Sequence, residues 1–258
     1  MNFSLFYSPL EQFEILPLIS LYLGGLDFSI TNETVILGLI FFLLTLLLQS
    51  SFKSNEFGGL FITPHSWQSM IEFIYKMILS MLIDNIDVKR GQFFFPLVFS
   101  VFLFIVCLNT IGLVPYGFTL TSHLIVTFAL SLFLFIGINI ICIRLHGIEF
   151  FSLFLPQGTS FILALLLVPI ELISYVFKPI SLSIRLFANM MAGHTLLKVI
   201  AGFAWTLMSA TGILFFVHFV PLFILLPLFG LELGVALIQS FVFSILICIY
   251  LNDAIKLH

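Results

Sequence analysis

Long apolar runs separated by short polar stretches dominate the pattern of this chain. A helix needs about 20 predominantly apolar residues to cross the hydrocarbon core of a bilayer. Five runs qualify, at 35–52, 93–114, 124–143, 160–208 and 220–251. The last two are longer than an upright crossing requires. We therefore predict five membrane-embedded helices, of which the last two are steeply tilted or broken at weak points such as Pro179, Gly193 and Gly202.

The segment 64–87 has a different pattern. Its polar residues recur every four positions, while apolar side chains cover the other side; the polar members are Gln68, Glu72, Lys76, Ser80 and Asp84. A polar face opposite an apolar face is typical of an amphipathic helix that lies at the membrane interface. We therefore predict one interfacial helix in addition to the five spans, in an all-α membrane protein with a single domain.

The composition changes this picture little but excludes other classes of protein. Of 258 residues, 61% are hydrophobic and only 8% are charged, whereas soluble domains carry about 25% charged residues. The surface must therefore face lipid, and the basic footprint of a nucleic-acid-binding protein is missing. Cys107, Cys142 and Cys248 lie far apart in apolar runs, without the spacing of a metal or redox site. We expect no nucleic-acid partner, no metal and no cofactor.

Lysine and arginine are distributed unequally between the two ends of the predicted spans. Five crossings place the following residues on one side: Lys53, Lys89, Arg90, Arg144 and Lys256. The N-terminal segment and the connections at 113–122 and 203–221, which share the other side, contain neither residue type. By the positive-inside rule, the first side, which includes the C-terminus, faces the cytoplasm or an organellar matrix.

Polar residues in the run 160–208 share one helical face. They follow one another at spacings of three or four residues, at Glu171, Ser174, Lys178, Ser181, Arg185 and Asn189. A charge in mid-membrane is unfavourable by several kcal/mol and marks an interior, a cavity or a pathway. Charges on a merely solvated face would sit near the end of a span, whereas Arg185 has apolar turns on both sides. We therefore interpret Arg185 as functional.

His194 and Glu232 are candidates for a proton relay. His194 lies nine residues after Arg185, which turns it about 180° away on a regular helix. A lone buried histidine is more often a packed core residue. Here Glu232 lies at a comparable depth in a predicted antiparallel neighbour, which favours a relay, and imidazole titrates near physiological pH. Gln239 and Asp253 follow Glu232 on one face, at intervals of seven and fourteen residues.

Three blocks of the sequence resemble subunit a of F-type ATP synthases. They are LNTIGLVPYGF at 108–118, PISLSIRLFANMMAGHTLL at 179–197 and LELGVALIQSFVFSILICIYLNDA at 231–254. The resemblance covers most of the chain from about residue 96 onward, while the first 60 residues are only loosely similar. The combination of His194 with Glu232 is similar to mitochondrial members; many bacterial and chloroplast members have Glu at the position of His194.

The resemblance implies a fold and a set of roles. The last two spans would be long, tilted and antiparallel, and would curve along a rotating ring of c subunits. Arg185 matches the essential arginine of the family, and the mid-membrane polar residues would be Ser181, Asn189 and Gln239. His194 and Glu232, with Asn109, match the half-channel open to the intermembrane space. The matrix half-channel would contain Glu171, with Ser174 on its face and Asp253 assigned there by topology.

The resemblance also implies partners and a location. The expected partners are the c-ring, the peripheral-stalk subunit b, other membrane-sector subunits and the lipid bilayer. The expected location is the mitochondrial inner membrane, with the N-terminus toward the intermembrane space and the C-terminus toward the matrix. Protons would be the transported ion, and the chain would have no catalytic site of its own.

Two other classes of protein stay open on the residues alone. An intramembrane enzyme could use His194, His218 and Glu232 as a metal or acid–base site, but neither HExxH spacing nor a nucleophile elbow is present. A self-contained channel or transporter would need polar residues on several helices around one axis, or repeated halves. Co-purification with a ring of small hairpin proteins that carry a mid-membrane carboxylate would discriminate these classes from a stator subunit.

Overall fold

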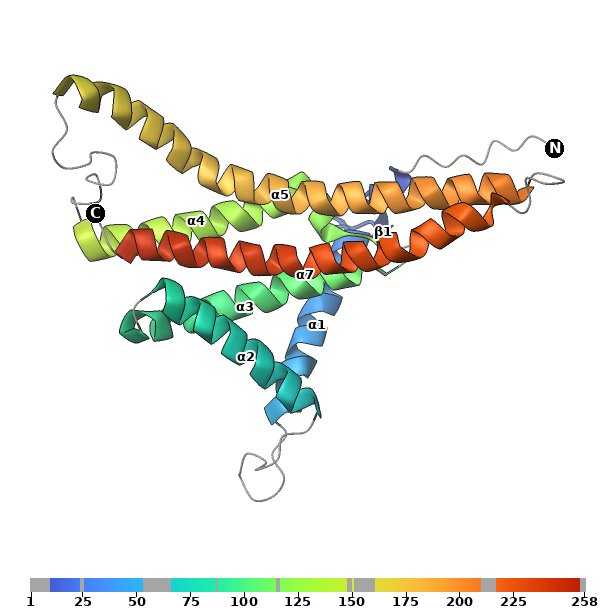
Figure 1. The fold of residues 1–258 in the computed structure, drawn as a ribbon, viewed down its shortest axis with the longest axis horizontal. Coiled ribbons are helices and arrows are strands. Elements are labelled where there is room, and N and C mark those ends of the chain that lie inside the picture. The colour runs from blue at the N-terminus through green and yellow to red at the C-terminus, as the bar shows by residue number, and fades with distance from the viewer. Residues whose placement is uncertain are drawn as a thin grey trace, which may run out of the picture. The chain divides into compact units, whose positions relative to one another are not determined.

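The computed structural model describes residues 10–23, 26–52, 66–86, 88–114, 117–147, 150, 161–209 and 217–255. Its helices are α1 Asn32–Phe52, α2 Ser66–Asn85, α3 Val88–Gly112, α4 Leu124–His146, α5 Phe161–Ser209 and α7 Phe219–Ile255 (Figure 1). Within the described residues, all of these except α2 are long and apolar enough to cross a membrane. The predicted class, an all-α membrane protein, is confirmed.

Helix bounds differ from the predicted ranges mainly where charged residues occur. The predicted runs stopped at charges, whereas α3 begins at Val88 and α7 continues to Ile255, past Asp253. Backbone hydrogen bonding extends a helix through charged residues that lie near the membrane surface. Five predicted positions at the ends of elements or in the charge pattern fall outside the described residues, namely Lys53, residues 64, 87 and 160, and Lys256.

Helix α5 is continuous over 49 residues. It includes Pro169 and Pro179 and passes through Gly193 and Gly202 without interruption. This run was expected to be either tilted or broken. The helix is not broken at Pro179, Gly193 or Gly202. If straight, a helix of this length would extend about 74 Å, more than twice a ~30 Å hydrocarbon core.

Short strands precede α1 and were not predicted from the sequence. Strand β1 Pro17–Ile19 pairs with β4 Ile30–Thr31, and β2 Tyr22–Leu23 pairs with β3 Leu26–Asp27, both antiparallel. Asn32 joins this region to α1, because its Nδ2 donates to the Glu14 carbonyl at 3.1 Å and its Oδ1 accepts from the Glu33 N–H at 3.0 Å. An amide oxygen that accepts a first-turn N–H stabilises the start of a helix.

The chain divides into two compact units. Unit 1 comprises Met1–Leu43, Ile105–His123 and Leu186–Gln239, and unit 2 comprises Leu44–Phe104, Leu124–Arg185 and Ser240–His258. Each unit contains a part of α5 and a part of α7. In unit 1, Leu113, Met190 and Ala236 form a buried apolar cluster. In unit 2, Thr127 of α4 hydrogen-bonds Ser183 of α5 at 3.1 Å, with both hydroxyls buried.

Candidate functional site

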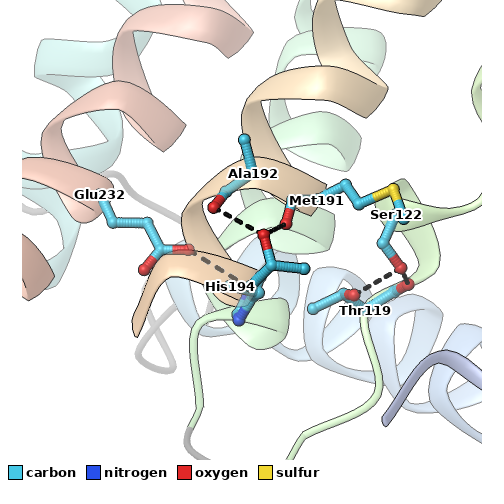
Figure 2. Close-up of polar contacts among 7 residues, drawn as sticks. Thr119, Ser122, Met191, Ala192, His194 and Glu232 are labelled. Carbon is cyan, nitrogen blue, oxygen red and sulfur yellow. Dashed lines mark hydrogen bonds and ion pairs between the residues drawn. The ribbon is translucent and has the colours of Figure 1, made fainter. Parts of the chain in front are cut away.

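A histidine and a glutamate face each other in unit 1. His194 on α5 places its Nε2 atom 3.6 Å from Oε1 of Glu232 on α7 (Figure 2). The two side chains retain 13% and 5% of their exposed surface. Both side chains are therefore largely shielded from solvent, on two helices that consist mainly of apolar residues. An ionisable pair in such a place indicates a functional site rather than a solvated ion pair.

The pair is close but is not hydrogen-bonded. A separation of 3.6 Å exceeds hydrogen-bond distance. Among the described residues, neither Nε2 of His194 nor either carboxylate oxygen of Glu232 has a hydrogen-bond partner. Such buried polar atoms are unfavourable unless a proton, water or another group reaches them. The geometry leaves this carboxylate available to exchange a proton with its neighbour.

Gly193 provides the space in which the Glu232 carboxylate lies. A methyl group at residue 193 would be 2.6 Å from Oε1, 2.9 Å from Cδ and 3.1 Å from Cγ of Glu232. These separations are below normal van der Waals contact. Gly193 was predicted only as a weak point of the helix, because nothing in the sequence indicates which glycine of α5 touches α7.

A cavity of about 240 Å³ adjoins the carboxylate. Its lining includes Asn189, Gly193 and Glu232, and its other walls are apolar residues of α5 and α7. A water molecule occupies about 30 Å³ in the liquid, so the cavity has room for several. It therefore offers space for water beside an otherwise enclosed carboxylate.

Amide side chains lie one to two turns from this pair. Nδ2 of Asn189 donates to Oε1 of Gln239 at 2.9 Å, and Gln239 is buried. Nδ2 of Asn109 on α3 donates to the Ala236 carbonyl of α7 at 3.2 Å, and Asn109 is fully buried. Asn109 therefore contacts the backbone one turn beyond Glu232 and helps to hold that part of α7. Asn189 contacts Gln239, whereas His194, further along α5, lies beside Glu232, which is earlier on α7. The two helices therefore run antiparallel in this unit.

The other predicted site residues belong to unit 2. Arg185 is exposed and forms no ion pair or hydrogen bond with any residue that the structure describes. Three further members of its predicted face are also exposed, namely Glu171, Ser174 and Ser181. Lys178 is half-buried and pairs with Asp253 of α7 at 3.3 Å. The predicted face thus contains an exposed, unpaired arginine and one paired lysine.

The described side chains that could bind a metal ion do not form a metal site. Among the residues that the structure describes, no three His, Cys, Asp or Glu side chains come together as a metal ion would require. The site brings together His194 and Glu232, an arrangement that can hold and pass a proton.

Comparison with known proteins agrees with these features. The family model described as ATP synthase A chain matches residues 33–252. ATP synthase subunit a of Pylaiella littoralis is 54% identical over 256 residues, which is 98% of this chain and 100% of the relative. The corresponding proteins of Marchantia polymorpha and Chondrus crispus are 50% and 49% identical, with 97% of this chain covered in each case and 99% and 97% of the relatives.

Matches of this extent establish the family that the three sequence blocks indicated. The match runs from α1 almost to the end of α7 and includes Arg185, His194 and Glu232. The chain belongs to the ATP synthase subunit a family and is therefore a proton-translocating membrane subunit of ATP synthase.

Proposed function

We propose that this chain provides two offset half-channels, which load protons onto and unload them from the carboxylates of a rotating c-ring. The observation that carries the proposal is the buried His194–Glu232 pair beside a cavity in unit 1. Arg185, which is exposed and has no ion pair with any described residue, supports it from unit 2. An ionisable pair inside a spanning region marks a proton path.

Proton entry is assigned to His194 and Glu232. A proton that enters the cavity reaches the Glu232 carboxylate, whose oxygens are not occupied by other described donors. Transfer between the two side chains requires the 3.6 Å gap to close slightly or a water to bridge it. Imidazole suits the relay because both of its protonation states are accessible near neutral pH. Asn109 holds the neighbouring turn of α7 in position.

Arg185 controls the unloading of protons. A neutral carboxyl group on the ring can move through lipid, whereas an ionised one is held back by several kcal/mol. Opposite Arg185 the ionised form is favoured by about 4 kcal/mol, for a separation of ~4 Å and an effective dielectric constant near 20. The guanidinium does not lose its own proton, so it also blocks a direct hop between the half-channels. Ser181 adds a polar group on the face of Arg185 in unit 2, and Asn189 and Gln239 provide a hydrogen-bonded pair of polar groups within unit 1.

The released proton leaves past Ser174 and Glu171, which are exposed on the face of Arg185. This exit side corresponds to the matrix, since the lysines and arginines of the chain accumulate there. The setting that fits is the mitochondrial inner membrane, with the N-terminus toward the intermembrane space. The c-ring, subunit b and further membrane-sector subunits are the partners. The driving energy is about 2.3 kcal/mol per proton per 100 mV.

A double-mutant cycle tests the proton entry path. His194→Gln and Glu232→Gln should each lower proton flux without loss of assembly, because each removes one ionisable group and changes the side-chain volume little. The double variant should be about as slow as the slower single variant, since residues in contact on one path are not additive. Flux is measured per assembled complex in vesicles with an imposed pH gradient. Strictly additive losses would show that the two residues do not share a path.

Cysteine crosslinking tests which face of α5 meets the ring. Ser181→Cys, in a background without the three native cysteines, should crosslink to c subunits with high yield. Leu172→Cys is the matched control, because it is also exposed, at 50%, but lies nine residues earlier and about 180° round the helix. Equal yields at the two positions, or crosslinks from residue 181 only to lipid probes, would rule out the proposed ring-facing side.

A further inference from the structure

Lys178 lies among charged and aromatic groups from both long helices of unit 2. Its Nζ atom is 3.3 Å from Oδ2 of Asp253 on α7. The same atom is 5.2 Å from the ring centre of Tyr175 on α5 and 5.0 Å from that of Tyr250 on α7. An ammonium group within about 6 Å of an aromatic ring is attracted to its face. One carboxylate and two aromatic rings therefore hold this ammonium group.

The cluster extends to a third helix. The hydroxyl of Tyr175 donates to Oδ1 of Asn139 on α4. Nearby, Nε2 of His146 on α4 lies 3.2 Å from the Ile255 carbonyl of α7. Lys178, Tyr175 and Asp253 thus lie where polar contacts connect α4, α5 and α7 within unit 2. These rings and hydrogen bonds lie around the lysine, whose side chain is 30% exposed, while that of Asp253 is 42% exposed.

Lys178 lies on α5 between the two residues of the proposed proton exit path, so its charge affects proton exit. Lys178 lies seven residues after Glu171 and seven before Arg185, which is about 10 Å along the helix from each. An unpaired ammonium group between these two residues would repel a proton that moves from Arg185 toward Glu171. Asp253 supplies the opposite charge at 3.3 Å and so cancels that repulsion at short range.

We propose that Lys178 and Asp253 form a fixed, mutually neutralising charge pair, in which both are positioning residues and Asp253 does not carry the exported proton. The proposal rests on the proposed function, because it concerns the exit path next to Arg185. It gives Asp253 a role that differs from its assignment, by topology, to the proton path of the matrix half-channel. Lys178 orients the carboxylate, the tyrosines hold Lys178, and Glu171 is left as the exit carboxylate.

Rescue by a neutral pair separates this role from proton carriage. Asp253→Asn and Lys178→Gln each leave one charge unpaired, and each should lower proton flux per assembled complex by roughly tenfold, within the range of coupling between contacting residues. The double variant Lys178→Gln/Asp253→Asn carries neither charge and should recover most of the flux. Asp253→Glu, which keeps the charge, should stay near the original flux. A proton carrier at residue 253 would instead leave the double variant as slow as Asp253→Asn.

The remaining outcomes are equally decisive. The proposal would be overturned if the single variants kept their flux per assembled complex, even if less complex assembled. It would also be overturned if the double variant did not recover flux. Tyr250→Phe keeps the ring and should preserve flux, whereas Tyr250→Leu should lower it. Arg185→Ala in the same assay tests the proposed function separately. Flux that does not depend on Arg185 would contradict the half-channel mechanism, whereas dependence on Arg185 without rescue would contradict only the charge pair.

Discussion

Replacement of Arg185 with alanine is expected to abolish proton-driven ATP synthesis, with a loss of about a thousandfold. The estimate follows from the attraction of about 4 kcal/mol between Arg185 and a ring carboxylate, since each 1.4 kcal/mol corresponds to a factor of ten. Arg185→Lys should also fail, because a lysine can lose its proton in an apolar setting and lacks the planar, forked guanidinium. ATP synthesis is measured in vesicles with an imposed proton gradient.

The fold should tolerate this substitution. Arg185 is exposed and has no ion pair or hydrogen bond with the described residues, so its removal leaves neither a buried cavity nor an unpaired partner. Ile184→Ala is the matched control, because Ile184 is the preceding residue and is 49% exposed. Both variants should assemble, and only Arg185→Ala should lose activity. Normal coupled synthesis in Arg185→Lys would contradict the role assigned to the permanent charge.

Gly193→Ala is expected to reduce proton flux by tenfold or more, although it adds a single methyl group. That methyl group would lie 2.6 Å from Oε1 of Glu232 and would displace a carboxylate that is 5% exposed. The carboxylate has the adjoining cavity to move into, but such a move takes it away from His194, and a shift of ~1 Å in a reacting group can lower a rate by 10²-fold. Flux per assembled complex is the measurement.

Gly202→Ala separates this effect from helix stability. Gly202 lies on the same helix, and a methyl group there would meet no atom within 4 Å. In both variants alanine favours the helical backbone by about 1 kcal/mol relative to glycine. The two variants should therefore be similarly stable, while only the change at residue 193 lowers flux. Equal flux in the two would show that the close contact with Glu232 has no part in proton entry.

Much of the fold and the local part of the site could be predicted because membrane insertion makes each charge informative. Arg185 was predicted to be functional from its depth in an apolar run, and that role stays a prediction, whereas the five spans followed from the lengths of the apolar runs. The expectation that His194 faces Glu232 required only that two neighbouring helices run antiparallel. Each of these predictions needs only the pattern of a single helix, or the assumption that two neighbouring helices are antiparallel.

Contacts between distant segments could not be predicted in the same way. Lys178 and Asp253 are separated by 75 residues, and which lysine meets which carboxylate depends on the rotation of each helix about its axis. The link between Asn109 and the Ala236 carbonyl depends in addition on the depth at which α3 lies. The strands before α1 are only two or three residues long, too short for alternation of apolar and polar residues to indicate them.

The two prolines inside α5 give this helix an uneven stiffness. Proline has no N–H, so Pro169 and Pro179 each remove one hydrogen bond from the backbone of a helix that is otherwise continuous. Ten residues separate them, so the two gaps point in directions about 80° apart around the axis. A rod weakened on two different sides bends in two planes, whereas one weakened on a single side acts as a simple hinge. Helix α5 therefore has two points at which its backbone is weaker, and it can bend there in different directions while it keeps its helical register.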